Sequence, residues 1–430
     1  MAPDRPTSPN TASSQHWQPS MTGPAYDVII IGAGAAGLLC ARECVLRGLR
    51  VLVLEGGEKT GRKLCLAGGG KANFSNRDIA PCHYHSSLPN ACQHALRGFP
   101  TRDILRLVEG WSLPYEERKH GQLFLRTAAL KLRDALLRDC TTNGCDIVCR
   151  APVSRIWQEN EWFCVASNEH VWTAKGVGLA TGSPACPQCG ANASGYELAR
   201  QLGHAIIPHR PALAPLLMPH DWPSATSPCA ALAGICLPVR ISLPEHPGLS
   251  WQDDLLFTHE GISGPAVLKA SLFWEVRQML EIDFAPDANV EQLCDTQGKS
   301  LARTIVRRII PLRLADALLP PALADRKCAE LSRGQRQSLA ASIHAHKCLP
   351  LRTAGLKQAE ACNGGVDMRE VNSRSMESTL TPHLWFMGEV LDVTGLLGGY
   401  NLHWAWASAM AAARSMAKTF GAQIATARGL

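Results

Sequence analysis

The chain has 430 residues, of which 46% are hydrophobic and 19% are charged, with a formal net charge of +6. This composition is ordinary for a soluble globular protein and sufficient for two or three domains with hydrophobic cores. No apolar run approaches the roughly 20 residues of a membrane-spanning helix, so no membrane partner is expected. Residues 1–25 are rich in Pro, Ser and Thr and lack the apolar segment of a secretory signal, which predicts a disordered tail.

The 17 cysteines are an odd number scattered through predicted helices and strands. This is not the spacing of a disulfide framework, and it favours a reducing, cytoplasmic setting. Cys186 and Cys189 form the only Cys-x-x-Cys pair, which is compatible with a redox pair or half of a zinc site. Because no second pair exists and no obvious helix follows, loop cysteines are the simpler interpretation, and no metal site is predicted.

Residues 26–55 are the stretch around which the chain is organised. An apolar, β-branched run at 28–31 predicts a buried parallel strand. Residues 38–46 predict a helix that ends before Gly48, and residues 51–54 predict a second buried strand. This strand–helix–strand order is typical of a dinucleotide-binding unit.

The first strand is followed directly by Gly-x-Gly-x-x-Gly. In this fingerprint Gly32 permits the tight turn, Gly34 lets a pyrophosphate approach the backbone, and Gly37 allows close packing of helix on strand. The helix N-terminus offers free N–H groups and partial positive charge to the phosphates. Glu55, at the end of the second strand, is placed to accept hydrogen bonds from a ribose.

A glycine loop follows at 67–76, and its backbone can lie against a flat ring or a phosphate. Arg62, Lys63 and Lys71 would balance an anionic cofactor. Residues 61–76 read Gly-Arg-Lys-x-x-x-x-Gly-Gly-Gly-Lys-x-Asn-Phe-Ser-Asn, and with the preceding fingerprint they resemble the YhiN/BaiN-type flavoproteins. The resemblance implies a bacterial oxidoreductase that uses FAD and NAD(P)H. Family members often carry Arg-Cys where this chain has Lys71-Ala72, so a role of that cysteine does not transfer.

Further along, helical periodicity predicts helices at 101–111 and 127–140, and short strands are predicted between 146 and 174. Ala180-Thr181-Gly182 then resembles the strand end that returns to the cofactor in two-dinucleotide flavoproteins. A helix predicted at 195–204 follows this loop. Where the family usually has an aromatic residue before proline this chain has Cys186, which we interpret as a substitution in a substrate-side loop.

From 206 onwards prolines are dense, and period-two alternation predicts a small antiparallel β-domain. Within it, residues 255–266 resemble a family signature in which Thr258, His259 and Ser263 could face the flavin. A turn before a helix with Pro265 in its first turn explains most of the same pattern.

Residues 289–361 predict short helices broken by prolines. Residues 299–357 within them, the basic segment, hold 12 basic residues against three acidic ones, a net charge of +9. Such asymmetry favours an anionic partner, although a solvated helical face explains it equally well.

The C-terminal motifs at 363–367, 385–392 and 398–402 match the same family closely, and an Ala-rich helix is predicted at 404–416. The resemblance, which spans 26–416, implies that the strand ending at Gly388-Glu389 returns to the ribityl chain. It also implies that the helix beginning near Gly399 directs its N-terminus at the flavin pyrimidine. Asp392 either belongs to this site or caps a turn.

The predicted fold is therefore α/β, an FAD-binding Rossmann-like domain of the two-dinucleotide type with an inserted antiparallel β-domain and a small helical subdomain. The expected parts are the tail 1–25, the FAD-binding domain 26–205 and 362–430, the β-domain 206–288 and the basic helical subdomain 289–361. The residues expected to hold the cofactor are Gly32, Gly34, Ala35, Ala36, Gly37, Glu55, Gly56, Arg62, Lys63, Gly68, Gly69, Gly70, Asn73, Ala180, Thr181, Gly182, Gly388, Glu389, Asp392, Gly399, Tyr400, Asn401 and Leu402.

The expected activity is hydride transfer from NAD(P)H through FAD to an electron-poor C=C bond. The resemblance suggests a uridine of 23S ribosomal RNA, a steroid-like enone, or a small amine that would be oxidised instead. The basic segment favours ribosomal RNA. A non-catalytic, flavin-bearing RNA-binding factor is the rival from another class, and a flavin monooxygenase is a weaker one. Uridine reduction needs a general acid, for which the candidates are Cys65, Lys71, Cys186 and His259. The oligomeric state is left open.

Overall fold

The computed structural model describes residues 26–224 and 227–427 of the protein. The predicted tail at 1–25 lies outside the described residues. All 17 cysteines are free thiols, as their irregular spacing predicts. Within the described part of the chain, no helix combines the length and the apolar character needed to cross a bilayer.

The first part of the molecule is built on a seven-stranded sheet in the order β7-β2-β1-β10-β9-β8, with β22 also paired to β10. Its strands are β1 (Tyr26–Ile31), β2 (Val51–Leu54), β7 (Asp146–Val148), β8 (Val153–Glu159), β9 (Trp162–Ser167), β10 (His170–Leu179) and β22 (Leu384–Phe386). The strands β7, β2, β1, β10 and β22 are parallel, whereas β9 pairs antiparallel with both of its neighbours, β10 and β8. Strand β10 is continuous from His170 to Leu179. It includes the strand predicted at 171–174 and the residues that lead to Ala180.

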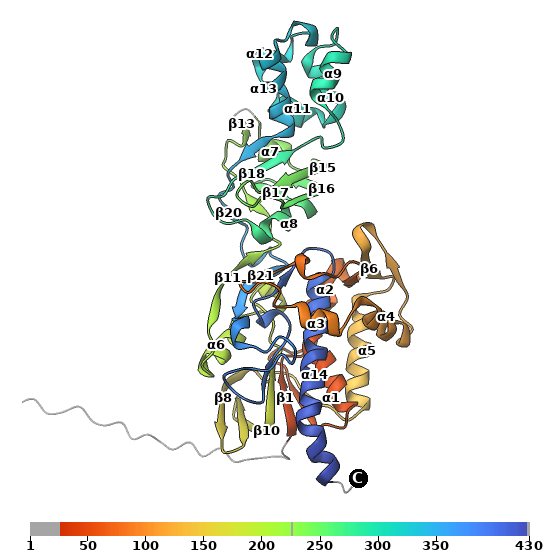
Figure 1. The fold of residues 1–430 in the computed structure, drawn as a ribbon, viewed down its shortest axis with the longest axis vertical. Helices are drawn as coiled ribbons and strands as arrows, with labels where there is room; N and C mark the ends of the chain where they lie inside the picture. The colour runs from red at the N-terminus through yellow and green to blue at the C-terminus, as the bar shows by residue number, and fades with distance from the viewer. Residues whose placement is uncertain (1–25, 225–226, 428–430) are drawn as a thin grey trace, which may run out of the picture.

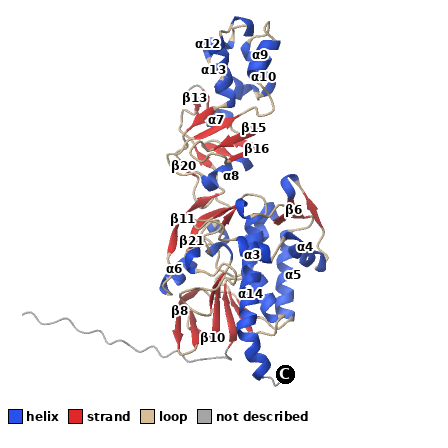
Figure 2. Ribbon diagram, viewed as in Figure 1, coloured by secondary structure: helices blue, strands red, loops and turns tan. Residues whose placement is uncertain are grey.

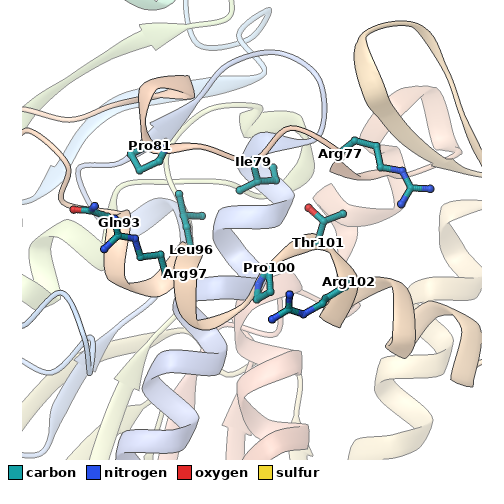
Figure 3. Close-up of a pocket in the computed structure, with 9 residues that line it drawn as sticks. All are labelled: Arg77, Ile79, Pro81, Gln93, Leu96, Arg97, Pro100, Thr101 and Arg102. Carbon is teal, nitrogen blue, oxygen red and sulfur yellow. The ribbon is translucent and has the colours of Figure 1, made fainter.

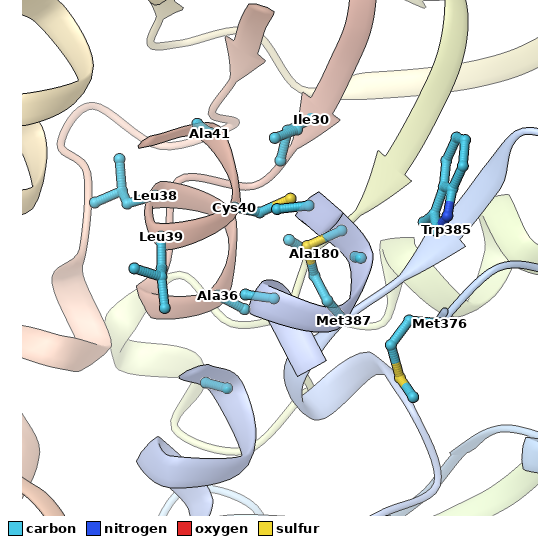
Figure 4. Close-up of a cluster of buried hydrophobic side chains, with 14 of the residues drawn as sticks. Ile30, Ala36, Leu38, Leu39, Cys40, Ala41, Ala180, Met376, Trp385 and Met387 are labelled. Atoms are coloured by element: carbon cyan, nitrogen blue, oxygen red, sulfur yellow. The ribbon is translucent and has the colours of Figure 1, made fainter. Parts of the chain in front are cut away.

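Two helices from opposite ends of the chain cover one face of this sheet (Figure 1). Helix α1 (Ala35–Val45) lies beside α14 (Tyr400–Ala427), and the thiols of Cys40 and Cys44 lie 3.8 and 3.7 Å from the sulfur of Met416. Figure 4 shows side chains of β1, α1 and the β22 region in one buried cluster. The N- and C-terminal parts therefore share a single hydrophobic core.

Smaller elements complete this part of the molecule. They are α2 (Arg62–Gly70), β3 (Asn73–Asn76), β4 (Tyr84–His85), α3 (Gln93–Gly98), α4 (Thr101–Gly110), β5 (Tyr115–Glu117), β6 (Gln122–Leu125), α5 (Ala129–Thr142), α6 (Ser194–Gln201) and β23 (Thr394–Gly395). The predicted glycine loop follows the helical turns of α2, although the bounds of α2 include its glycines. Helical dihedral angles end before Ala67, which has ψ of 136°, and Gly68 and Gly69 have positive φ.

A second sheet stands apart from the first, with its own core (Figure 2). Its order is β19-β18-β15-β16-β17-β12-β20, and every pairing in it is antiparallel. Its elements are β12 (Leu216–Leu217), β15 (Cys236–Ser242), β16 (Ser250–Phe257), β17 (Gly261–Ser263), α8 (Pro265–Phe273), β18 (Leu280–Asp283), β19 (His346–Cys348) and β20 (Arg352–Thr353). Strands β19 and β20 lie in the range 289–361, for which the sequence predicts only helices. They form because each pairs antiparallel with an edge of the sheet, β19 with β18 and β20 with β12.

Helices α9 to α13 lie at the end of the molecule farthest from α1 and α14 (Figure 1). They are α9 (Val290–Thr296), α10 (Ala302–Ile309), α11 (Leu312–Leu318), α12 (Pro321–Ala324) and α13 (Arg333–His344). Strands β11 (Ile206–Ala212) and β21 (Ala361–Val366) pair antiparallel where the chain leaves the first part and returns to it. A short hairpin, β13 (Pro223–Ser224) and β14 (Ser227–Pro228), precedes α7 (Cys229–Leu232).

Candidate functional site

The turn between β1 and α1 requires glycine at two positions because the chain packs against itself there. Gly32 has φ of +103°, and a Cβ on it would lie 2.4 Å from the carbonyl oxygen of Ala180. A Cβ on Gly37 would lie 1.9 Å from the carbonyl oxygen of Gly32. The turn is thereby held against the end of β10, where Ala180 N–H donates to the Ile31 carbonyl at 2.8 Å.

Gly34 is placed differently, because a Cβ on it would meet nothing within 4 Å. It is the N-cap of α1, whose first helical hydrogen bond runs from Leu38 N–H to the Gly34 carbonyl at 3.0 Å. The N–H groups of Ala35, Ala36 and Gly37 therefore have no partner within the helix. The first turn of α1 carries no acidic residue. Open space, free donors and the helix dipole together suit an anionic ligand.

Glu55 lies at the end of β2 beside the same turn. Its two carboxylate oxygens accept hydrogen bonds from Ala33 N–H and Gly57 N–H, both at 2.8 Å. The next residue predicted to bind the cofactor, Gly56, is exposed. The two backbone bonds fix the orientation of the carboxylate, and its remaining lone pairs can still accept bonds from a ribose.

The loop after β10 approaches the glycine turn from the other side. The hydroxyl of Thr181 is buried and has no hydrogen-bond partner in the described structure. A Cβ on Gly195, in α6, would lie 1.8 Å from that hydroxyl, so this helix can pack here only because residue 195 is glycine. Gly182 has positive φ, and a Cβ on it would meet nothing within 4 Å. A buried hydroxyl without a partner beside open space is a feature that a bound polar ligand would satisfy.

An ion pair joins three segments that are distant in sequence. Lys63 Nζ in α2 lies 2.6 Å from a carboxylate oxygen of Glu389, and the Ser183 hydroxyl donates to the same oxygen at 2.9 Å. Gly388, just before Glu389, packs on α1, since a Cβ on it would lie 3.0 Å from the Cβ of Ala36. Lys63 and Glu389, both predicted cofactor residues, therefore also tie the two ends of the chain together.

The glycine loop has the left-handed backbone that only glycine adopts freely. Gly68, Gly69 and Gly70 have φ of +58°, +66° and +82°. Gly68 lies tightly against Asn73, whereas a Cβ on Gly69 would meet nothing within 4 Å. At Gly69 the loop therefore offers backbone without a side chain, as binding of a flat ring would require.

The N-terminus of α14 packs directly on this loop through β3. Gly399 has φ of +93°, and a Cβ on it would lie 2.2 Å from the Ser75 carbonyl oxygen. In the amide orientation that satisfies its neighbours, Asn73 accepts a hydrogen bond from Gly399 N–H at 3.1 Å. Asn76 donates to the Gly398 carbonyl at 2.9 Å, and Asn401 exchanges two hydrogen bonds with the Gly395 backbone.

The neighbouring residues Tyr400 and Leu402 complete the first turn of α14. The Tyr400 carbonyl accepts a hydrogen bond from the Tyr84 hydroxyl at 3.1 Å, and burial raises the pKa of Tyr400 to about 12. Leu402 packs at the edge of the main core. Asp392 is buried and accepts hydrogen bonds from both the backbone N–H and the hydroxyl of Ser87. It therefore fixes the chain just after β4.

His403 is a buried polar residue that sequence patterns did not single out. Its Nδ1 lies 2.9 Å from the Ser75 hydroxyl and its Nε2 lies 3.0 Å from the Phe99 carbonyl. Because a carbonyl only accepts, Nε2 carries the proton and Nδ1 accepts from Ser75. Burial lowers the pKa of His403 to about 4, so the ring is neutral at pH 7. Nothing in the local sequence marks this role, since both partners are distant along the chain.

The four candidate general acids come from two parts of the molecule, His259 from the second sheet and the other three from the first part. Burial raises the pKa of the half-buried Cys65 thiol, whereas Lys71 is exposed. His259 is also exposed and lies in the turn between β16 and β17 of the second sheet. In that sheet Asp253 of β16 lies 3.5 Å from His120 of the first part, and His259 follows the C-terminal end of the same strand.

Cys186 and Cys189 form a tight turn close to Lys63 and Arg62. Cys189 N–H donates to the Cys186 carbonyl at 2.8 Å, and Cys186 has φ of +67°. Burial and the neighbouring thiol raise the pKa of Cys189 to about 11, against the opposing effect of Lys63 and Arg62. Arg62 itself donates to the Gln188 carbonyl at 3.2 Å. The thiols thus border the candidate site, but burial keeps Cys189 protonated at neutral pH.

Comparison with known proteins places this geometry in a family. A family profile described as "HI0933-like protein Rossmann domain" matches residues 26–415. The chain belongs to this family. The ribosomal RNA dihydrouridine synthase of Haemophilus influenzae is 38% identical over 91% of this chain and 98% of that protein. The enzyme of the same name from Escherichia coli is 34% identical over 91% and 98% of the two chains.

A 3-dehydro-bile acid delta(4,6)-reductase of Clostridium scindens is 28% identical over 90% of this chain and 98% of that protein. The predicted YhiN/BaiN-type membership and the α/β Rossmann fold are therefore confirmed. The prediction that the chain is an FAD-dependent oxidoreductase is likewise confirmed at the level of enzyme class.

The residues present fit FAD as the cofactor of this class. The open space at Gly34, Gly69 and Gly182, the unsatisfied first turn of α1 and the unpartnered Thr181 hydroxyl are all features that a bound dinucleotide would occupy. The roles of individual residues as FAD ligands stay a prediction. Among the described residues, no group of three or more His, Cys, Asp and Glu side chains could hold a metal ion.

Proposed function

We propose that the protein reduces a uridine of 23S ribosomal RNA to dihydrouridine. The observation that carries this proposal is the full-length likeness to two ribosomal RNA dihydrouridine synthases, at 38% and 34% identity over 98% of each relative. The oxidoreductase class and the open, anion-accepting turn at Gly34 are consistent with it.

Reduction of the uracil C=C bond requires a hydride at one carbon and a proton at the other. FAD, when bound, supplies the hydride chemistry. The residues proposed to hold it are the glycine turn, Glu55, the loop at 180–182 and the first turn of α14. The partial positive charge at the N-terminus of α14 would stabilise the negative charge of a reduced ring by roughly 0.3–1 kcal/mol. Cys65 in α2, Lys71 directly after α2 and Cys186 in the turn beside Arg62 are proposed as candidate proton donors.

NAD(P)H is proposed as a transient electron donor. The sequence has a single Gly-x-Gly-x-x-Gly directly after a strand, so we propose no dedicated nicotinamide domain. NAD(P)H would then dock, deliver its hydride and leave before the RNA base enters. Such alternation at one site produces ping-pong kinetics.

The basic segment is proposed as one contact for RNA, although part of its charge is already neutralised. Arg303, Arg307 and Arg336 form ion pairs with aspartates on the same set of helices. By contrast, Lys327 and Arg333 are exposed and form no side-chain ion pair among the described residues. Exposed cations without an ion pair, of which these are two, are available to phosphates.

Mass mapping of dihydrouridine tests the proposal. Ribosomal RNA from cells without the gene should lose one dihydrouridine, and the purified protein with FAD and NADPH should restore it in vitro. Retention of every dihydrouridine in the deletion strain would contradict the proposal.

Reduction of a steroid-like enone is a second candidate, favoured by the 28% identity to the bile acid reductase. Turnover of such an enone without turnover of RNA would establish it instead. Anaerobic mixing with NADH or NADPH separates both enzymes from a non-catalytic binding factor. Either enzyme requires the flavin to bleach within seconds, whereas a binding factor would leave it oxidised.

A further inference from the structure

A pocket lined by three arginines lies next to the N-terminus of α14, and none of the features described so far accounts for it. Figure 3 shows Arg77, Arg97 and Arg102 around it, together with Gln93 and Thr101. Its volume is about 380 Å³, at the lower end of the range for small-ligand sites. The lining contains no acidic residue. The arginines come from three segments, the chain after β3, helix α3 and the start of α4, so the fold brings them together.

The charges of these arginines are only weakly compensated. Arg77 Nε lies 2.9 Å from Glu117, but both side chains are about half exposed, so water screens the pair. Arg102 lies 3.9 Å from Asp103, which also pairs with Arg106. Arg97 forms no side-chain hydrogen bond or ion pair within residues 26–224 and 227–427. An unpaired Arg97 guanidinium and an exposed Arg102, in a lining without a carboxylate, suit a phosphate, to which arginine donates two parallel hydrogen bonds.

Two hydrogen bonds connect the pocket to the site described above. The Thr101 hydroxyl, in the pocket, donates to the Asn76 carbonyl at 2.8 Å. The side-chain amide of Asn76 donates to the Gly398 carbonyl at 2.9 Å, one residue before Gly399. A phosphate held in the pocket would therefore sit at a fixed position relative to the N-terminus of α14. Helices α9 to α13, by contrast, lie at the opposite end of the molecule (Figure 1).

We propose that this pocket, lined by Arg77, Arg97 and Arg102, binds a phosphodiester of the RNA substrate close to the target uridine. The inference rests on the proposed function. Phosphate contacts position a nucleic acid without reading its sequence. The pocket would thus set the register of the strand near the flavin, while the distant helices α10 to α13 of the basic segment supply general affinity. The phosphates of NADPH are the other source of the same chemistry, and the experiment separates the two.

The test measures equilibrium binding of an unmodified 23S ribosomal RNA transcript to the flavin-loaded full chain, over a series of salt concentrations. The variants are Arg97→Gln, Arg102→Gln and the double substitution. The matched control is Arg138→Gln, an exposed arginine of α5 for which no side-chain ion pair is formed among the described residues. The same proteins are mixed anaerobically with NADPH to measure the rate of flavin reduction. Flavin content and thermal midpoint establish that each variant is folded. If one single variant does not fold, the other still tests the pocket.

We expect each pocket substitution to weaken RNA binding by about three- to tenfold and to reduce the slope of log affinity against log salt by about 0.7–0.9. Flavin reduction by NADPH should be unchanged, and Arg138→Gln should behave as wild type. Unchanged RNA affinity in the double variant would overturn the proposal. A raised KM for NADPH with unchanged RNA affinity would also overturn it, and would assign the pocket to the nucleotide donor.

These outcomes are distinguishable from failure of the proposed function. A wild-type chain that binds RNA through Arg97 but forms no dihydrouridine would refute the function and keep the pocket. Full dihydrouridine formation and RNA affinity in the double variant would refute the pocket and keep the function. A wild-type chain that does not bind the transcript would overturn the pocket assignment.

Discussion

Two glycines of the same turn, three residues apart, have opposite surroundings. Gly37 is confined by backbone at 1.9 Å, whereas Gly34 opens onto space. Packing alone therefore explains Gly37, but it does not explain Gly34, whose φ of −78° any residue can adopt. The difference allows a structural glycine to be separated from a ligand-binding one.

We predict that Gly34→Ala leaves the thermal midpoint of the apoprotein nearly unchanged but weakens FAD binding by at least about tenfold, because the new methyl group would occupy the approach of the pyrophosphate. Gly37→Ala should destabilise the apoprotein itself by several kcal/mol, since overpacking against backbone cannot relax. Differential scanning of apoprotein and flavin titration would measure both effects. Equal FAD affinity in Gly34→Ala and wild type would contradict the proposed cofactor position.

His403 gives the folded state a specific dependence on pH. Its pKa is lowered from 6.5 to about 4 in the folded protein, so the unfolded chain takes up the proton first as the pH falls. The contribution of the neutral His403 ring to the free energy of unfolding is fully present above about pH 6.5. It is lost progressively towards pH 4, by up to about 3 kcal/mol.

We therefore predict that the stability difference between wild type and His403→Gln narrows between pH 7.5 and pH 5. The variant loses hydrogen bonds at both values but no longer carries the titrating ring. Urea unfolding at the two pH values would measure the difference. The other buried histidines are common to both proteins and cancel. A difference that stays constant would show that folding does not lower the pKa of His403.

At the level of secondary structure, the decisive contact is that between α1 and α14. These helices are more than 350 residues apart in the chain, yet Met416 lies against both cysteines of α1 and is fully buried. Gly178 on β10 is also close, since a Cβ on it would lie 3.0 Å from the methyl carbon of Met416. The first and last parts of the chain thus hold each other in place around the glycine turn.

Met416→Ala should lower the free energy of unfolding by about 2–5 kcal/mol, because it removes buried methylene groups and leaves a cavity between α1, β10 and α14. We expect FAD binding to weaken with it, since the turn at Gly34 depends on α1. Denaturant unfolding and flavin titration measure both, and Met416→Leu, which keeps the volume, is the control. Loss of stability with unaltered FAD affinity would show that the turn is held without α14.

For the molecule as a whole, two bodies with separate cores are joined through β11 and β21. The first carries the glycine turn, and helices α10 to α13 of the basic segment lie at the far end of the second (Figure 1). An RNA that contacts both the first body and these helices would be bound at widely separated places. Such an arrangement suits a large, folded substrate better than a small molecule.

We expect the double variant Lys327→Gln/Arg333→Gln to bind ribosomal RNA more weakly, with the salt slope reduced by about two. The paired control is Lys131→Gln/Arg138→Gln, two exposed cations on α5. Filter binding at several salt concentrations would measure the slope. Identical slopes in all three proteins would remove the basic segment from the RNA interface.

If NADPH and the RNA base bind the same site one after the other, the kinetics are ping-pong. We then expect parallel lines in double-reciprocal plots of rate against NADPH at several RNA concentrations. The same analysis with apoprotein supplied with FAD controls for flavin loss during turnover. Intersecting lines would mean that both substrates bind together, and would require a separate nicotinamide site.

Much of the first domain was predictable because its determinants are local. A buried strand, Gly-x-Gly-x-x-Gly, a helix and a second strand lie within 30 consecutive residues. The periodicity of the hydrophobic residues and the spacing of the glycines predict these elements directly. The approach of Gly399 to Ser75, the neutral His403, the unpartnered Thr181 hydroxyl and the arginine pocket were not predictable in this way. Each depends on residues brought together from segments that are tens to hundreds of positions apart. Local pattern therefore specifies which elements form, whereas the packing of distant segments specifies which of their side chains meet, are buried or remain free for a ligand.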